Sequence, residues 1–160
     1  MHTSKSVLTT LLTASFLALG CSSDDSSMME PDDPAGGVAP GTARVTIGGT
    51  TWMATASSCG NFGGTALIFT GQANGDPSIS ITLDAIPADP PSNSARIDVS
   101  DEVSWRAGQS VQDLGGTVPM VTAQNGYGTG SATFVNTLDP NGFSTGVYAT
   151  ATGDYEFNCR

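Results

Sequence analysis

Apolar and polar residues alternate with a period of two along several short segments between residues 43 and 160. In residues 78–84, one face carries three aliphatic side chains: Ile79, Ile81 and Leu83. Residues 95–100 repeat the alternation, with Arg96 and Asp98 on the polar face. A period of two matches a β-strand, in which successive side chains point to opposite faces of a sheet. These segments therefore predict strands with one face buried and one face in water.

Further strands are expected wherever β-branched and small residues lie between turn signals. The expected segments are residues 44–47, 50–56, 65–70, 117–123, 131–138, 145–152 and 154–159. Gly48 and Gly49 indicate a hairpin, and residues 74–77 and 139–142 indicate turns between neighbouring strands. About eight or nine short strands separated by turns predict an all-β fold, either an antiparallel β-sandwich or a barrel.

Residues 101–114 allow two interpretations. As a helix, they place apolar residues on one face and end at Gly115 and Gly116, which would stop it. The apolar residues of that face are Val103, Ala107, Val111 and Leu114. Gly108 inside such a helix would cost about 1 kcal/mol relative to alanine. Residues 103–105 are equally compatible with an edge strand followed by a loop.

Residues 7–19, near the start of the sequence, form an apolar run. Lys5 precedes this run, and Gly20 and Cys21 follow it directly. This run is too short to span a bilayer as a helix, which takes about 20 apolar residues. A basic start, an apolar run and a small residue before a cysteine resemble the signal of bacterial lipoproteins. The resemblance implies cleavage before Cys21 and lipid chains on that residue, which would make a membrane the first partner.

The match to this signal has departures, and they leave a second possibility open. Ala18 and Leu19 do not follow the family's usual order of leucine and then a small residue. Ala18 and Gly20 also satisfy the small-x-small rule of ordinary secretion, so plain secretion with a free Cys21 is the alternative. By the same resemblance, Ser22 favours the outer membrane. We therefore expect a lipid-anchored cell-envelope protein whose domain faces the periplasm or the exterior.

The sequence divides into a signal peptide at 1–20, the lipidated cysteine with an acidic tether at 21–42, and one domain at 43–160. The tether combines low hydrophobicity with like charges, so the surface it can bury does not offset its ordering entropy. As a flexible chain it would reach roughly 25 Å. The remaining length is enough for one domain with a modest core.

Composition excludes several kinds of chemistry. Removal of residues 1–20 takes away the only lysine, Lys5, and the only histidine, His2, and leaves four arginines against 15 acidic residues. Without histidine there is no Ser-His-Asp triad and no Cys-His dyad, and the commonest zinc ligand is missing. Strong negative charge argues against nucleic-acid binding. We expect no catalytic residue, no metal and no cofactor.

The lipoprotein resemblance also accounts for an odd number of cysteines. With Cys21 lipidated, Cys59 and Cys159 remain as a pair in an oxidising compartment. Their bridge would close a loop of about 100 residues and contribute about 4–5 kcal/mol in the chain-entropy model. Alternation puts Cys159 on the face of Tyr155 and Phe157, which predicts a buried bridge. Two unpaired buried thiols are the alternative.

A second resemblance concerns the domain. Residues 47–52 form a short glycine-turn hairpin with Trp52, and residues 130–134 and 153–157 carry matching glycine and aromatic positions. The arrangement resembles small bacterial lipoproteins with one all-β domain of unknown function, in which the first hairpin opens the domain and the second closes it. The resemblance implies a fold class and no known activity.

Carboxylates are the catalytic groups left in quantity. Glycoside cleavage needs a protonated acid and an ionised partner about 5–10 Å apart. Asp98, Asp101 and Glu102 lie close in sequence, whereas Asp84, Asp154 and Glu156 are expected to face outward on strands. Calcium takes oxygen ligands, but the turns at 74–76 and 139–142 lack the spacing of a calcium loop.

Aromatic faces beside polar side chains are typical of carbohydrate sites, and the candidate ligand contacts are Trp105, Tyr127 and Tyr148. Tyr127 lies in the glycine-rich segment 125–130, which is expected to be a loop and a contact surface. The sequence therefore predicts a non-enzymatic binding or structural module for envelope glycan or another protein. The alternatives are a carboxylate-based hydrolase, including one that acts on glycan, and a secreted β domain without lipid.

Overall fold

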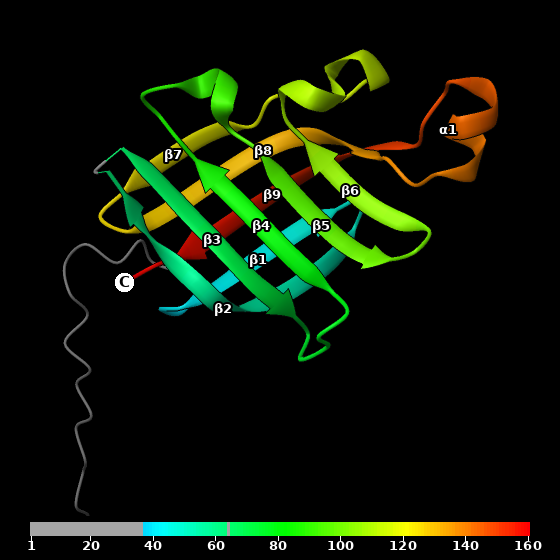
Figure 1. The fold of residues 1–160 in the computed structure, drawn as a ribbon. Coiled ribbons are helices and arrows are strands. Elements are labelled where there is room, and N and C mark those ends of the chain that lie inside the picture. The colour runs from blue at the N-terminus through cyan, green and yellow to red at the C-terminus, as the bar shows by residue number, and fades with distance from the viewer. Residues whose placement is uncertain (1–36, 64) are drawn as a thin grey trace, which may run out of the picture. The chain divides into compact units, whose positions relative to one another are not determined.

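The computed structural model describes residues 37–160 apart from residue 64, so the expected signal segment, Cys21 and most of the expected tether lie outside the described residues. Nine strands occur in the described part (Figure 1). They are β1 (Thr42–Ile47), β2 (Thr50–Phe62), β3 (Ala66–Ala73), β4 (Ser80–Ala85), β5 (Ala95–Ser100), β6 (Val103–Ala107), β7 (Met120–Gln124), β8 (Tyr127–Asn136) and β9 (Thr150–Asn158). Three short helices accompany them: η1 (Pro90–Ser92), η2 (Gln109–Leu114) and α1 (Pro140–Thr145).

Eight of the strands form a closed antiparallel barrel. The order of neighbours is β6-β5-β4-β3-β2-β1-β9-β8, and β8 returns to β6 through the pairs Trp105–Asn136 and Arg106–Val135. The remaining strand, β7, pairs only with the first half of β8. The prediction of an all-β fold is confirmed, and of its two forms the barrel is correct and the sandwich is wrong.

The barrel interior holds the apolar faces of the strands. Ile81, Leu83 and Ile97 are fully buried there, which confirms the alternation predicted for residues 78–84 and 95–100. The other large side chains of the interior are Val45, Ile47, Trp52, Leu67, Phe69, Phe134, Tyr155 and Phe157. The outward positions of the same strands carry the polar side chains, as a small barrel in water requires.

Glycines in the barrel wall make room for the aromatic rings. A Cβ atom added to Gly130 would lie 2.3 Å from Cζ of Tyr155, and one added to Gly128 would lie 2.6 Å from Cζ of Phe157. Each of these glycines is the register partner of the aromatic residue that covers it. Because such contacts are shorter than any stable carbon–carbon approach, β8 must carry glycine at both places. The interpretation of residues 125–130 as a loop is therefore wrong from Tyr127 onward.

Two of the predicted turns are present, with glycine or asparagine at the positions of positive φ. Gly48 and Gly49 join β1 to β2 with φ of +57° and +86°, and the flanking residues pair directly. Asn74 and Gly75, with φ of +55° and +70°, stand between β3 and β4. Two consecutive residues of positive φ match the twist of antiparallel strands, so the hairpin at 48–49 and the turn at 74–77 are confirmed.

The segment 101–114 is not one helix. Residues 103–107 form β6, in which Trp105 is the register partner of the core residue Ile97, and η2 follows instead of a loop. Gly108 separates the two elements with φ of +141°, a conformation outside the helical region. The strand interpretation is correct, but β6 is not an edge, because β8 pairs with its second half and closes the barrel.

The strand expected at 145–152 is wrong for residues 145–149 and correct for residues 150–152. After β8 the chain makes the short helix α1, and β9 starts at Thr150 and runs unbroken to Asn158. Asp139 caps the helix: its side chain accepts hydrogen bonds from the backbone N–H of Asn141, at 3.0 Å, and of Ala149, at 2.8 Å. An aspartate followed by proline begins a helix as readily as a turn, because proline fits the first helical position.

Tyr155 gives the fold a pH dependence that can be measured. Its hydroxyl is buried and donates to the carbonyl of Asp84 at 3.4 Å. Burial, and after it the negative charge of Asp84, raises the pKa of Tyr155 well above its ordinary value near 10. The folded chain thus holds the proton more tightly than the unfolded chain. The stability linked to it is complete below the unfolded pKa and is lost as the pH rises toward the folded pKa.

We therefore expect the urea midpoint to fall as the pH is raised above about 10, and Tyr155→Phe to reduce that fall. Urea unfolding of both proteins across the alkaline range measures it, with Tyr148→Phe as the control at a half-buried tyrosine. An equal fall in Tyr155→Phe and the native chain would contradict the assignment.

Candidate functional site

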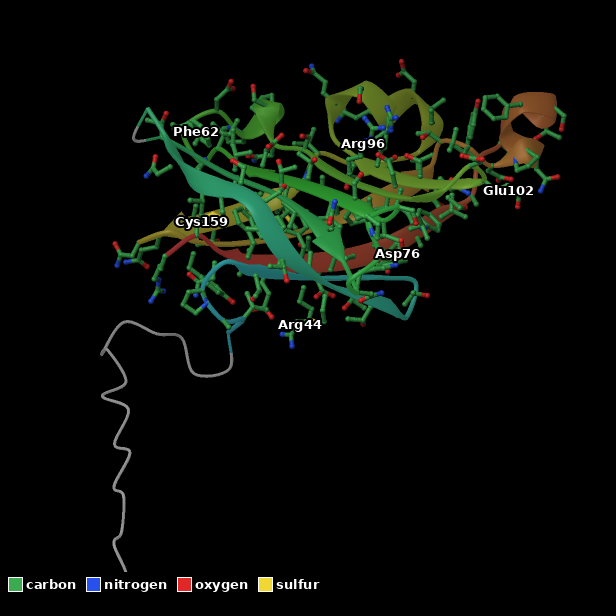
Figure 2. The ribbon with its side chains drawn as sticks, turned by 60° about the horizontal axis from the view of Figure 1, so that its bottom comes forward. Arg44, Phe62, Asp76, Arg96, Glu102 and Cys159 are labelled. Atoms are coloured by element: carbon green, nitrogen blue, oxygen red, sulfur yellow. A yellow bond between two sulfur atoms is a disulfide. The ribbon has the colours of Figure 1, made fainter. Side chains whose placement is uncertain are left out.

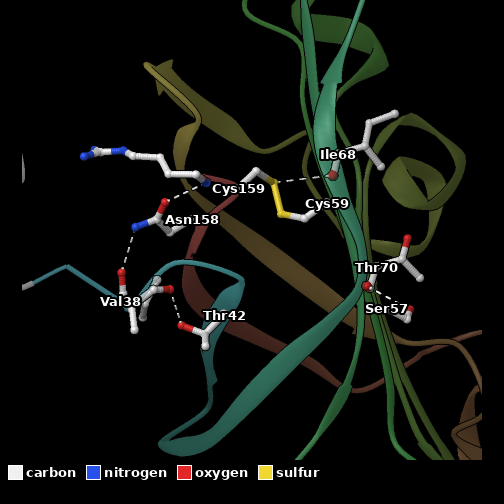
Figure 3. The surroundings of a disulfide bond; sticks show 10 residues. Val38, Thr42, Ser57, Cys59, Ile68, Thr70, Asn158 and Cys159 are labelled. Carbon is white, nitrogen blue, oxygen red and sulfur yellow. Dashed lines mark hydrogen bonds between the residues drawn. A yellow bond between two sulfur atoms is a disulfide. The ribbon is translucent and has the colours of Figure 1, made fainter.

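One end of the barrel is held together by a disulfide. β1 pairs with β2 only as far as Thr55, and β2 then continues to Phe62 with β3 as its strand partner. Cys59 lies in this overhang and bonds to Cys159, directly after β9, with a Cα–Cα distance of 5.1 Å (Figure 3). The predicted pairing is confirmed, but both cysteines are half-buried, so the prediction of a buried bridge is wrong.

The described chain enters the barrel at this same end. The side-chain amide of Asn158 donates to the carbonyl of Val38 at 3.1 Å, and both residues are buried. Val38 therefore packs against the barrel although the sequence placed it in the tether. Figure 2 shows Cys159 and Phe62 toward this end and Glu102 toward the opposite end, beside α1. We call the end that carries the disulfide the barrel mouth.

A pocket of about 330 Å³ opens at the barrel mouth. Its described lining comes from the end of β2 and start of β3, the loop after β4, and the β7–β8 turn: Asn61, Thr65, Ala66, Leu67, Pro87, Ala88, Ala123, Gln124, Asn125 and Gly126. Leu67, only 4% exposed, belongs to the core and gives the pocket an apolar wall. The exposed amides Asn61, Gln124 and Asn125 supply donors and acceptors at the rim.

The segments that carry the disulfide also hold the walls of the pocket in place. The backbone N–H of Cys159 donates to the carbonyl of Gly126 at 2.7 Å, which fixes the β7–β8 turn to the end of β9. On the other side, Cys59 pairs with Phe69 and Asn61 pairs with Leu67 in the β2–β3 ladder. The bridge therefore joins the two walls between which the pocket lies.

The size and chemistry of the pocket suit a small uncharged ligand. Pockets that bind small molecules start at about 300 Å³, combine apolar walls with a few polar groups, and often occupy the mouths of barrels. The described lining side chains are amide, hydroxyl or apolar. Arg160 is not among them, although its aliphatic Cγ packs beside Gly126. Such a lining recognises hydrogen-bonding groups without selecting a charge.

The three aromatic residues predicted as ligand contacts lie apart from this pocket and from one another. Trp105 is half-buried and packs against the barrel core. Tyr127 is half-buried near Gly37, and its hydroxyl donates to Glu156. Tyr148 packs on Gly142 at the opposite end of the barrel, edge-to-face with Phe143 at 5.8 Å between ring centres. The structure does not bring the three together into one platform.

The carboxylates singled out from the sequence are dispersed over the outside of the barrel. Asp84 accepts from the hydroxyl of Ser94, and Asp98 accepts from Ser104 and pairs with Arg96 at 2.6 Å. Glu156 pairs with Arg44, whereas Asp101, Glu102 and Asp154 are exposed. None of these residues belongs to the described lining of the mouth pocket.

The two turns considered for calcium use their oxygens within the chain. Asp76 accepts from the hydroxyl and the backbone N–H of Ser78, and these hydrogen bonds lower the pKa of the Asp76 carboxyl. Asp139 caps α1 as described above. Among residues 37–63 and 65–160, no three histidine, cysteine or acidic side chains lie close enough to hold a metal ion. Within the same ranges, no helix is long and apolar enough to cross a membrane.

The fold and the pocket place the chain among small antiparallel barrels with a ligand-sized opening at one end. Comparison with known proteins adds no assignment: no protein-family model and no curated protein matches the chain. The residues of the pocket are therefore the basis on which a function can be assigned. Sequence inspection missed them, although Asn125-Gly126 between alternating segments is a hairpin signal that would have placed the turn.

Proposed function

We propose that the chain is a lipid-anchored binding module of the cell envelope, without catalytic activity, and that the mouth pocket is its binding site. The ligand is an uncharged polar part of an envelope glycan or protein. The observation that carries the proposal is the pocket itself, with its apolar wall at Leu67 and its amide rim at Asn61, Gln124 and Asn125. A closed barrel supplies a rigid frame for such a site.

The charge distribution supports an uncharged ligand. The chain has a formal net charge of −10, yet residues 114–153 contain one charged residue, Asp139, which is buried as the cap of α1. This stretch includes β7 and the β7–β8 turn, which form one wall of the pocket. A neutral surface on an acidic molecule admits neutral partners and weakens attraction for cationic ones.

The anchor is tested by the intact mass of the protein purified from its host's membranes. We expect the mass of residues 21–160 plus a diacylglyceryl group and an acyl chain, less two protons for the disulfide. That result would establish lipid on Cys21 and leave the outer membrane as the favoured location. An unmodified chain in the soluble fraction would refute the anchor and favour the secreted alternative.

Binding at the barrel mouth is tested by amide shifts in nitrogen-15 NMR spectra of the mature chain in detergent. Two neutral probes represent the two ligand classes: the tetrasaccharide of N-acetylglucosamine and a capped five-residue peptide, Ser-Val-Thr-Val-Ser. We expect one probe to shift the signals of Thr65, Gln124 and Asn125. Ala88→Trp, which fills the rim of the pocket, should weaken that binding by at least about tenfold, a change of about 1.4 kcal/mol.

Gln72→Trp is the matched control, because it places the same indole at an exposed position of β3 that is not in the pocket lining. Shifts that spread over the outside of the barrel and survive Ala88→Trp would refute the pocket as the site. Release of shorter sugars from the tetrasaccharide would instead favour the carboxylate hydrolase, which no contact in the pocket lining supports.

A further inference from the structure

β7 is the one described strand that pairs with a single neighbour, since it lies beside β8 alone. The two strands are joined by Asn125 and Gly126, with φ of +49° and +78°, and the flanking residues Gln124 and Tyr127 are register partners. In a two-residue hairpin of this kind the flanking pair exchanges both backbone hydrogen bonds, and bonding pairs then alternate along the ladder. Gln124, Thr122 and Met120 therefore bond to β8.

The alternation leaves Val121 and Ala123 with their backbone N–H and C=O groups directed away from β8. Within the part of the chain that the structure describes, neither residue has a backbone or side-chain hydrogen-bond partner at these groups. Both residues are half-buried, and their side chains pack against the barrel core. Unpaired backbone groups at a half-buried position cost free energy unless water or a ligand satisfies them.

A hydrogen bond just before β7 shows which segment the open side of this strand faces. The carbonyl of Pro119, two residues before Val121, accepts a hydrogen bond of 3.3 Å from the side-chain amide of Asn93, which is buried. The open edge of β7 thus faces the segment that follows β4. Nearer the turn, Ala123 lines the mouth pocket opposite Pro87 and Ala88. The free backbone groups of Ala123 are directed to the pocket side of the strand.

The edge also lacks the usual protection against strand pairing. Edge strands of soluble proteins commonly carry charged side chains that prevent addition of another strand. β7 has the sequence Met-Val-Thr-Ala-Gln, without a charge, although the chain as a whole is strongly acidic. The protections that remain are its shortness, Pro119 before it, and the segment after β4, from which Asn93 donates to the carbonyl of Pro119.

We propose that the mouth pocket binds a short extended peptide segment, uncharged and polar, which adds to β7 as a further strand. This inference rests on the proposed binding function and names its partner class. The backbone of the peptide would pair with Ala123 and then Val121. Its side chains would alternate between the apolar wall at Leu67 and the amide rim, as strand addition requires.

The lining favours a peptide over a glycan. Sugars commonly stack on aromatic rings, and the described lining of the pocket contains no aromatic side chain. A row of backbone donors and acceptors two residues apart is instead the pattern that another strand presents. Affinity would come from these backbone groups, so it would depend weakly on the sequence of the peptide.

The test uses the mature chain in detergent and the capped peptide named above, with a matched peptide N-methylated at alternate residues. The native peptide should bind, shift the amide signals of Val121 and Ala123, and slow their hydrogen exchange at least about tenfold. The N-methylated peptide keeps the side chains but loses the backbone donors, and we expect no binding. This comparison needs no substitution in the protein.

A substitution tests the same edge from the protein side. Ala123→Pro removes the N–H that faces the pocket and leaves the ladder with β8 intact, because proline is tolerated on the open side of an edge strand. We expect the Kd of the peptide to rise about tenfold or more, while Ala123→Ser, which keeps the N–H, stays within about twofold.

Equal binding of both peptides, or an unchanged Kd in Ala123→Pro, would overturn strand addition. Binding of the tetrasaccharide to the pocket amides without binding of the peptide would also overturn it, while the proposed binding function would stand. If neither probe shifts any pocket amide at millimolar concentration, both proposals fail, because backbone pairing tolerates most uncharged sequences.

Discussion

Replacement of Cys59 and Cys159 by serine is expected to lower the free energy of unfolding by about 4–5 kcal/mol. The bridge joins residues 100 apart in sequence, and it constrains the unfolded chain over almost the whole domain. In the chain-entropy model a loop of this length stabilises the folded state by about 4.7 kcal/mol. Many domains have a total stability of only about 5–15 kcal/mol, so the loss would bring this one close to unfolding.

Urea unfolding of the double variant and the native chain at neutral pH measures this effect. Ser58→Ala is the control, because it changes an exposed side chain next to Cys59 and leaves the bridge in place. The double variant alone should show broadened amide signals at Gly126 and Asn61, since the bridge joins the two walls of the pocket. A loss of less than about 1 kcal/mol would show that the native contacts hold this end of the barrel without the bridge.

Gly130→Ala is expected to destabilise the domain by about 3 kcal/mol, at the upper end of the usual cost of overpacking. The added methyl group would lie 2.3 Å from Cζ and 2.5 Å from the hydroxyl oxygen of Tyr155. That ring is buried in the barrel and bonded through its hydroxyl to Asp84, so it cannot move aside without loss of packing. The unfolding midpoint in urea, with an unchanged m-value, measures the effect.

Gly60→Ala supplies the matched control for this substitution. Gly60 is also a strand glycine, in β2, but a Cβ atom there would meet no atom within 4 Å. We expect that change to be neutral or to stabilise by up to about 1 kcal/mol, because it reduces the entropy of the unfolded chain. Similar losses in both variants would mean that backbone conformation, and not the ring of Tyr155, requires glycine at residue 130.

The strand pattern of the domain was predictable because burial repeats every second residue. Residues 78–84 and 95–100 alternate so regularly that each side chain could be assigned to a face before the structure was known. Closure into a barrel was not predictable in this way. It depends on β6 meeting β8 through Trp105 and Arg106, a pairing between distant residues that no local pattern specifies.

Two segments show why local rules failed elsewhere. Residues 125–130 are rich in glycine, which normally indicates a loop. Here Gly128 and Gly130 are strand residues. The aromatic rings of β9 occupy the space that side chains at these two positions would need. Residues 139–142 carry a turn signature that can also start a helix. The helix is stabilised by the buried side chain of Asp139, which accepts hydrogen bonds from the backbone N–H groups of Asn141 and Ala149.

The disulfide partners followed from the lipoprotein resemblance, which sets Cys21 aside and leaves two cysteines, whereas the pocket did not follow from any motif. Its lining residues are ordinary strand and turn residues whose only common property is that the fold brings their segments together. Asn61, Pro87 and Gln124 lie far apart in sequence and carry no distinctive chemistry alone. The open edge at Ala123 is a property of the backbone, so no side-chain pattern could indicate it.

The position of the last strand has a consequence for the order of folding. β9 lies between β1 and β8 and pairs with both, and Cys159 directly follows it. A chain without residues 150–159 can therefore neither join β1 to β8 nor form the disulfide. Pairings of such long range also form slowly. The earlier strands of a nascent chain must therefore wait for β9 before the barrel can close.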